Sequence, residues 1–375
     1  MAPANPQQCS RRGFLFAVPF AIAAKAATTG KGRQVPSALE RYLDPSTEFP
    51  VERLTDPAST SILPPPDART ISRRGNFLLY ASDSSGRMEA YRLDIKSGQS
   101  RQLTEAATLD PRSLTLLADE RSFAYLDEGR LYLASLGNLQ ARPIYRVPEG
   151  FETGTGLTVT TDGLYAALTE HAITEHTATH HRLRLIRMAD GTATTLAEAD
   201  EEIATPVPRP RRASILYRRG SALWLANFDA QQNYRLRVAE GDTAQATWSP
   251  DGRTVLYLNF PADPHKLHNL REFIPDSNQD QPIANTSQFV CFDRNGDSSV
   301  FVGASGSKAS PHVLLLLRAA QREFTLCEHR ASDPALVQPV FAPSSQRIFF
   351  NSDRDRKPAI YTMPVDKLVS ETDTP

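Results

Sequence analysis

Short apolar and aromatic runs recur along most of the chain, and each is bounded by residues that favour turns. Seven such runs stand at 77–80, 123–125, 165–168, 215–217, 255–258, 300–302 and 348–350. They repeat about every 45 residues, which is the length of one four-stranded blade in a β-propeller. Their β-branched and aromatic content, with turn pairs such as Asp162-Gly163, favours strands over a helical repeat. The pattern predicts an all-β protein folded as a seven-bladed β-propeller.

The last repeat is one strand short. The first repeat reads as three strands joined by tight turns, whereas the last repeat stops after 359–363. Residues 49–55, ahead of the first repeat, resemble the run at 101–104. We expect this N-terminal segment to complete the last blade, because that closes the ring and removes its exposed strand edges. The predicted organisation is one propeller over 49–375, preceded by an N-terminal arm over 27–48.

Residues 1–26 differ in character from the rest. Residues 10–15 read Ser-Arg-Arg-Gly-Phe-Leu, and an uncharged apolar run over 14–24 ends near Ala24-Lys25-Ala26. An arginine pair before a short apolar run and small residues is typical of a twin-arginine export signal. The run spans about 11 residues, whereas a membrane-spanning helix needs about 20. We predict an export signal over 1–26 and a mature chain that is periplasmic or secreted, without a transmembrane segment.

Net charge and cysteine content indicate whether a nucleic-acid partner and a disulfide are expected. The chain has 42 Lys and Arg against 43 Asp and Glu, for a formal net charge of -1. Without an excess of positive charge nothing favours a phosphate backbone, so no nucleic-acid partner is expected. Apart from Cys9 in the signal, Cys291 and Cys327 remain. An oxidising compartment permits a disulfide between them, but we expect two buried, unpaired thiols.

Several segments resemble one known family. One is a turn that is found in TolB-type propellers generally, Thr-Trp-Ser-Pro-Asp-Gly at 247–252. Four more specific motifs lie near the C-terminus: Leu-Cys-Glu-His at 326–329, Pro-Val-Phe-Ala-Pro at 339–343, Asn-Ser-Asp at 351–353 and Pro-Ala-Ile-Tyr at 358–361. Two others lie near the N-terminus: Arg-Leu-Thr at 53–55 and Tyr-Arg-Leu-Asp at 91–94. On these motifs the chain resembles the oligogalacturonate lyase family over about 49–365. The resemblance implies a seven-bladed propeller that cleaves short pectin fragments by β-elimination, using a divalent metal, typically manganese, held by several His and one Gln. Such a metal neutralises the uronate carboxylate and acidifies the C5 proton.

The positions that the resemblance assigns to metal ligands are substituted here. Two histidine positions of the family correspond to Gln245 and Gln288, and its Gln-and-His loop corresponds to 333–339, which holds Asp333 and Gln338. Neutral amide oxygens beside one carboxylate make a poor set of ligands in place of several histidines. We therefore expect the family's metal site to be lost, and manganese is implied by the resemblance alone. We predict that these four side chains converge at one end of the channel and contact substrate.

Five arginines lie close together in the middle repeats, at positions 209, 211, 212, 218 and 219. The family's histidine base corresponds to Arg218, and a guanidinium, which stays protonated, is a poor base. It binds carboxylates through two parallel hydrogen bonds, so it can take the place of a metal beside a uronate. We predict Arg218 and Arg219 as catalytic residues and Arg209 as a substrate-binding residue. The alternative is a solvated basic turn.

Histidines are the remaining candidates for proton transfer. His329, in the family-like Leu-Cys-Glu-His segment, is a third catalytic candidate, with a structural hydrogen bond as the alternative. Two further groups are His171, His176, His180 and His181 in the insertion 169–181, and His265 and His268 in the loop 261–269. We expect the insertion to be a polar surface loop; a metal shared by two of its imidazoles is the alternative.

Two classes of function stay open from the sequence. One is an enzyme resembling oligogalacturonate lyase that acts on oligogalacturonides or a related uronide. The other is a non-catalytic, TolB-type periplasmic propeller that binds a saccharide or a protein partner through the same face. A fold does not decide between them, because one scaffold supports both catalysis and binding.

Overall fold

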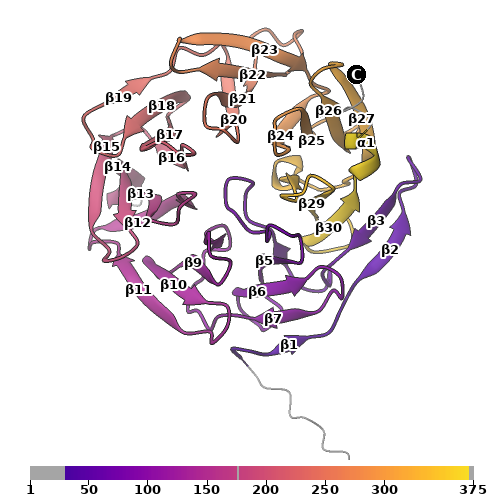
Figure 1. Ribbon diagram of the computed structural model, residues 1–375, viewed down its shortest axis with the longest axis horizontal. Coiled ribbons are helices and arrows are strands. Elements are labelled where there is room, and N and C mark those ends of the chain that lie inside the picture. The colour runs from indigo at the N-terminus through magenta and orange to yellow at the C-terminus, as the bar shows by residue number, and fades with distance from the viewer. Residues whose placement is uncertain (1–29, 175–176, 371–375) are drawn as a thin grey trace, which may run out of the picture.

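The computed structural model describes residues 30–174 and 177–370. Seven antiparallel sheets stand as blades around one axis (Figure 1), which confirms the all-β, seven-bladed propeller. The apolar runs of the sequence form the second strand of each blade. The predicted export signal lies outside the described residues.

The strands of each blade run outwards from the channel in the following order. Blade 1 has β4 (Ser61–Ile62), β5 (Phe77–Ser82), β6 (Glu89–Asp94), β7 (Ser100–Gln102) and β1 (Gln34–Val35). Blade 2 has β8 (Thr115–Leu116), β9 (Ser122–Asp127), β10 (Arg130–Ser135) and β11 (Ala141–Arg146). Blade 3 has β12 (Phe151–Val159), β13 (Tyr165–Thr174), β14 (Thr177–Arg187) and β15 (Ala193–Ala199). Blade 4 has β16 (Ile203–Pro208), β17 (Ser214–Arg219), β18 (Ala222–Asn227) and β19 (Asn233–Arg235).

The remaining three blades follow the same order. Blade 5 has β20 (Asp242–Trp248), β21 (Val255–Phe260), β22 (Asn269–Ile274) and β23 (Gln279–Asn285). Blade 6 has β24 (Phe289–Arg294), β25 (Val300–Ser305), β26 (His312–Leu317) and β27 (Arg322–Glu328). Blade 7 has β28 (Val340–Phe341), β29 (Arg347–Ser352), β30 (Ala359–Pro364), β3 (Pro50–Arg53) and β2 (Glu40–Leu43). Two short helices, η1 (Pro334–Leu336) and α1 (Asp366–Ser370), complete the described chain, in which no helix has the length and apolarity to cross a membrane.

The core lies in layers between neighbouring blades. One layer, for example, joins Leu216 and Leu225 of blade 4 to Trp248 and Tyr257 of blade 5. Because a second strand is covered on both sides, its side chains are buried continuously instead of alternately, as in β5. This is why the second strands stand out in the sequence as unbroken apolar runs.

The blades define two faces of the ring. The upper face carries the segments that lead into each innermost strand and the turns between second and third strands, such as 200–202 and 220–221 in blade 4. The lower face carries the turns between first and second strands, such as 209–213 in the same blade.

The N-terminal segment closes the ring. β3 pairs with β30 in the register Glu52↔Thr362 and Arg53↔Tyr361, which confirms the predicted strand closure. Two more short strands lie in the segment that we predicted as an arm: β2 pairs with β3, and β1 pairs with β7 of blade 1. The N-terminal chain therefore runs along the outer edges of the first and last blades (Figure 1).

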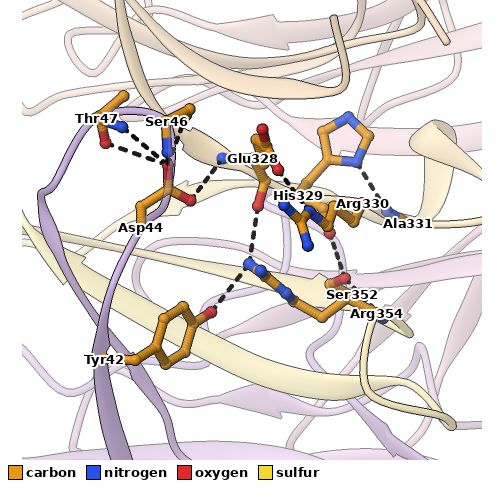
Figure 2. Close-up of polar contacts among 10 residues, drawn as sticks. All are labelled: Tyr42, Asp44, Ser46, Thr47, Glu328, His329, Arg330, Ala331, Ser352 and Arg354. Atoms are coloured by element: carbon orange, nitrogen blue, oxygen red, sulfur yellow. Dashed lines mark hydrogen bonds and ion pairs between the residues drawn. The ribbon is translucent and has the colours of Figure 1, made fainter. Parts of the chain in front are cut away.

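A hydrogen-bonded loop fastens this segment to blade 6 (Figure 2). The buried carboxylate of Asp44 accepts hydrogen bonds from the backbone N–H groups of Ser46 at 3.1 Å and Glu328 at 3.0 Å. Arg354 of blade 7 donates to the Tyr42 hydroxyl and to the Glu328 carbonyl oxygen, each at 3.0 Å. These contacts hold the closing strands against β27.

The loop between β4 and β5 crosses the lower end of the channel. Its Asp67 accepts a 2.6 Å hydrogen bond from Thr247 of blade 5, although the loop itself belongs to blade 1. Beside it, Asp293 is buried in a pocket of about 290 Å³ lined by blades 1, 5, 6 and 7. Two carboxyl groups therefore lie inside the fold at this end of the ring.

Both cysteines are buried and unpaired, as expected from the sequence. Cys291 lies on β24 and Cys327 on β27, the innermost and outermost strands of blade 6. Strands in a sheet are about 4.8 Å apart, so three steps separate the two residues by about 14 Å, beyond disulfide reach.

We expect neither thiol to react in the native protein. Burial raises the pKa of Cys291 to about 12 and raises the pKa of Cys327 as well, so almost no thiolate is present at pH 8. Titration of the mature chain with a thiol reagent at pH 8 should give no fast reaction, and both thiols should react in guanidinium chloride. A thiol that reacts within seconds without denaturant would contradict this burial.

Candidate functional site

The five arginines of the middle repeats do not form one cluster. β16 and β17 pair in the register Ile203↔Arg219 and Pro208↔Ile215, so Arg209 lies at the lower end of blade 4 and Arg219 at the upper end. Arg209 is buried at the lower end, where its Nε donates to the Gly252 carbonyl oxygen at 2.6 Å. The sequence-based grouping is wrong because an antiparallel strand separates residues at its two ends.

Arg218 and Arg219 remain on the upper face, each beside a carboxylate. Arg219 binds Glu201 and packs over the Trp224 ring at 5.1 Å. Arg218 approaches Glu202 at 3.5 Å, and its buried Nε has no hydrogen-bond partner. An unpaired guanidinium nitrogen is costly inside a protein, so Arg218 is held beside Glu202 at the expense of one unsatisfied donor.

His329 is held by the backbone through both ring nitrogens, and Figure 2 shows the contact with Ala331. Its Nδ1 accepts from the Ala331 N–H at 3.0 Å, and its Nε2 lies 3.0 Å from the Ser305 carbonyl oxygen. The ring is therefore the neutral tautomer with its proton on Nε2. Burial is the main cause that lowers its pKa. With neither nitrogen free, His329 serves as a structural hydrogen-bonding residue and not as a base, contrary to the catalytic role predicted for it.

Gln245 also bonds the backbone and offers nothing to a metal. Its Nε2 donates to the Phe292 carbonyl oxygen at 2.8 Å, and its Oε1 accepts from the Phe292 N–H at 3.0 Å. Both polar atoms of the amide therefore join the innermost strands of blades 5 and 6. The sequence predicted that Gln245 contacts substrate, whereas in the structure its side chain is hydrogen-bonded to the neighbouring blade.

Gln288, Asp333 and Gln338 lie on the upper face near the same strand, β24. Gln288 is exposed in the turn that leads into it, Asp333 caps η1 by accepting from Ala335 N–H at 2.9 Å, and Gln338 donates to the Ala335 carbonyl oxygen at 2.7 Å. The pocket beside Asp333 has about 30 Å³, room for about one water molecule. It is too small for a sugar.

These side chains do not fit a manganese ion. Both polar amide atoms of Gln245 are hydrogen-bonded to Phe292, Gln338 donates through its Nε2, and Asp333 caps η1. Across 30–174 and 177–370, no group of three or more His, Cys, Asp or Glu side chains is placed to hold a metal. The donor set expected for such an ion in the family is thus missing from the described chain.

The insertion in blade 3 is an extended β-hairpin and not the polar loop that we expected. β13 and β14 have 10 and 11 residues, against six in β17 and β18 of the next blade. His171 and His181 face each other across the hairpin, with ring centroids 5.5 Å apart. His180 packs edge-on against Phe151, and His176 lies outside the described residues.

A pocket of about 590 Å³ opens on the upper face beside this hairpin, and we call it the upper-face pocket. Its lining comes from blades 3 and 4 and from the segment that enters blade 2: Asp110, Arg112, Thr153, Gly154, Gly156, His171, Thr177, Ala178, His181, Asp200, Glu202 and Ile203. Pockets that bind small molecules usually have about 300–1,000 Å³. This one combines two imidazoles, three carboxyl groups and a guanidinium.

A bulge in β12 shapes one wall of the pocket. Register with β13 is lost between Thr153 and Leu157, and two of the intervening residues are glycines. A Cβ on Gly154 would lie 2.3 Å from Oγ1 of Thr169, and Gly156 has a φ of +90°. Glycine is required at both positions, and its missing side chains leave the wall open.

Burial and neighbouring charges set the protonation of the pocket. Burial, aided by nearby His171, lowers the pKa of His181 although Glu202 opposes the shift. Burial also raises the pKa of Asp110, against a hydrogen bond from the Arg112 N–H. The pocket therefore presents a neutral imidazole near neutral pH together with a carboxyl group that holds its proton more firmly than usual.

The sequence missed Arg112, Asp110 and Glu202 as pocket residues. Each follows or precedes a strand at the upper face, and only the ring brings their blades together. Arg112 is exposed and forms no salt bridge with a described residue, so its guanidinium is available to an anion.

The two histidines of the loop 261–269 do not line this pocket. His265 is exposed, and Nδ1 of His268 lies 2.9 Å from the Phe289 carbonyl oxygen.

Comparison with known proteins points to one family. Residues 29–267 match a family model described as oligogalacturonate lyase. The oligogalacturonide lyase of Pectobacterium atrosepticum is 23% identical over 90% of this chain and 99% of its own length. The oligogalacturonate lyase of Dickeya dadantii is 24% identical over the same shares. A solved oligogalacturonate lyase in complex with manganese superposes with a TM-score of 0.84 at 22% identity, over 89% of this chain and 98% of that one.

Proposed function

The chain belongs to the oligogalacturonate lyase family, and on this premise we propose that it cleaves short oligogalacturonides by β-elimination in the upper-face pocket, without a metal ion. The observation that carries the proposal is the pocket itself, which has a volume of about 590 Å³ and is lined by imidazole, carboxyl and guanidinium groups. β-Elimination from a uronate needs a cation for the carboxylate and a base for the C5 proton. The pocket supplies both kinds of group from the protein alone.

The charged groups match the parts of a uronide. We assign the carboxylate of one sugar residue to Arg112, because a guanidinium binds it through two parallel hydrogen bonds. Asp200 and Glu202 accept hydrogen bonds from sugar hydroxyls in this arrangement. Arg218 stands behind Glu202 at 3.5 Å and holds that carboxylate in place.

The test is an assay of the purified mature protein on unsaturated di- and trigalacturonate, with products identified by mass. One reaction contains EDTA and one contains added manganese. We expect cleavage at the same rate in both, because no described group holds a metal. Cleavage that depends on manganese would disprove the metal-free mechanism, and binding without cleavage would identify a non-catalytic propeller instead.

We expect Arg112→Gln to lower kcat/KM by about 10- to 100-fold, the effect of losing a hydrogen bond to a charged group. Most of the loss should appear in KM, because the carboxylate is bound before and during proton removal. Arg211→Gln is the matched control, since this exposed arginine lies on the lower face. Equal losses in both variants would mean that only net charge matters.

We also propose that the chain is exported through the twin-arginine pathway and acts outside the cytoplasm. The support is the pattern of 10–15 followed by the short apolar run. Replacing Arg11 and Arg12 together with Lys should retain the full-length precursor in the cytoplasm, as measured by fractionation and mass. Equal amounts of processed protein outside the cytoplasm in both strains would refute this.

A further inference from the structure

Three histidines of the upper face differ in how their rings are bonded. His329 uses both nitrogens on backbone groups, and His268 uses Nδ1 on a carbonyl oxygen while its ring packs on Phe260 at 4.0 Å between centroids. His181 has only 8% of its surface exposed, yet no hydrogen bond joins its ring to a described residue. The ring lies on the wall of the upper-face pocket, where its nitrogens are open to water or a ligand.

The surroundings of His181 suit a group that accepts a proton. His171 stands opposite at 5.5 Å between ring centroids and carries no hydrogen bond to a described residue either. Glu202 lies across the pocket on the next blade, where its charge stabilises an imidazolium once one has formed. The resting ring is neutral and the protonated ring has a counter-charge within the same site.

We propose that His181 is the general base of the reaction and takes the C5 proton of a uronate residue in the upper-face pocket. This inference rests on the proposed function and adds the identity of the base. It replaces Arg218 and His329, the candidates from the sequence, because a guanidinium keeps its proton and the His329 ring has no free nitrogen.

The step balances without any further reactant. A ring nitrogen of His181 takes the C5 proton, and the electron pair of the broken C5–H bond forms the C4=C5 double bond. The C4–O4 bond breaks, its electron pair leaves on O4, and O4 takes a proton from water. The imidazolium then returns its proton to solvent, and the products are an unsaturated uronide and a shortened saccharide.

The neighbouring groups give the reaction a defined pH dependence. Burial, His171 and His180 lower the pKa of His181, and Glu202 raises it, with a net shift below the ordinary value of 6.5. The other charged groups that line the pocket are Asp110, Arg112 and Asp200. Since the neutral ring is the active form and kcat/KM reports the free protein, kcat/KM should fall as pH drops, with a midpoint below 6.5.

The experiment compares wild type, His181→Gln, His171→Gln and His265→Gln on unsaturated digalacturonate. Binding is measured separately by calorimetry with galacturonate, which has no glycosidic bond at O4 and so is not cleaved. For His181→Gln we expect kcat to fall about 10²- to 10⁴-fold, the usual contribution of a general base, with galacturonate affinity within about twofold of wild type. His265→Gln, on an exposed loop, should match wild type in both.

His171→Gln tests the pH profile, which would not change if His181 had only a structural role. Removing its charge should raise the midpoint of the acid limb, because His171 lowers the pKa of His181. Wild-type cleavage that persists in His181→Gln would overturn the assignment of the base and leave the proposed function standing. Neither cleavage nor galacturonate binding by the wild type would overturn both together. Joint loss of affinity and turnover in His181→Gln would show a binding residue and refute the base.

Discussion

Replacing Val51 with Asp should lower the free energy of unfolding by about 4 kcal/mol, the largest loss of stability that we expect from one substitution. Val51 lies on β3, the strand that closes the ring, and its side chain is fully buried between blades 6 and 7. A carboxylate there has no partner, so it must take up a proton, remain charged and unsolvated, or expel the strand from blade 7. Each result weakens the closure of the ring.

The measurement is urea denaturation followed by tryptophan fluorescence, with Leu43→Asp as the control. Leu43 is on the adjoining strand β2 but is 65% exposed, so its change should cost less than about 0.5 kcal/mol. A loss below about 1 kcal/mol for Val51→Asp would show that the closing strand contributes little to stability.

Asp293→Asn should stabilise the protein at neutral pH and leave it unchanged in acid. Burial is the main cause that raises the pKa of Asp293 to about 6, with Asp67 nearby adding to the shift and Arg294 opposing it. Between about pH 4 and 6 the native state holds a proton that the unfolded chain releases, so stability falls as pH rises through that window. A shift of about two units corresponds to about 3 kcal/mol, and that is the gain that we expect from the neutral amide above pH 6.

The check is a set of unfolding curves at pH 4, 6 and 8. Asparagine can still accept the hydrogen bond that Asp293 receives from the Phe341 N–H at 2.8 Å, so packing is preserved. Asp297→Asn in the following turn should have the opposite sign: partial burial raises its carboxyl pKa, but hydrogen bonds from Ser299 outweigh this and lower it. Stabilisation of both variants at pH 8, or of Asp293→Asn at pH 4, would contradict this account.

The histidines show how hydrogen bonding in the structure changes the candidate for the base. The sequence predicted His329 as a catalytic residue because its segment resembles the family, whereas His181 lies in an insertion that was predicted to be a polar surface loop. What separates them is hydrogen bonding: His329 meets backbone groups through both ring nitrogens, whereas the His181 ring has no hydrogen bond to a described residue. No spacing rule predicts this, because the Ser305 carbonyl oxygen and the upper-face pocket come from distant parts of the chain.

The arginines were misjudged for a related reason. Arg209 and Arg218 are close in sequence, but the pairing of β16 with β17 sends them to opposite faces of the ring. Gln245 stands at a position that the resemblance gives to a metal-ligating histidine. The structure shows in addition that its amide joins two blades, because both of its polar atoms are hydrogen-bonded to Phe292.

By itself the sequence determined the seven-bladed ring, its N-terminal closure, its two unpaired thiols and the family. Strand, turn and repeat length are local properties, and seven copies of one local pattern are sufficient to specify a ring. Only the tertiary structure decided the site. The upper-face pocket takes Arg112 from the entry to blade 2, His181 from blade 3 and Glu202 from the entry to blade 4, and their meeting depends on how whole blades pack side by side.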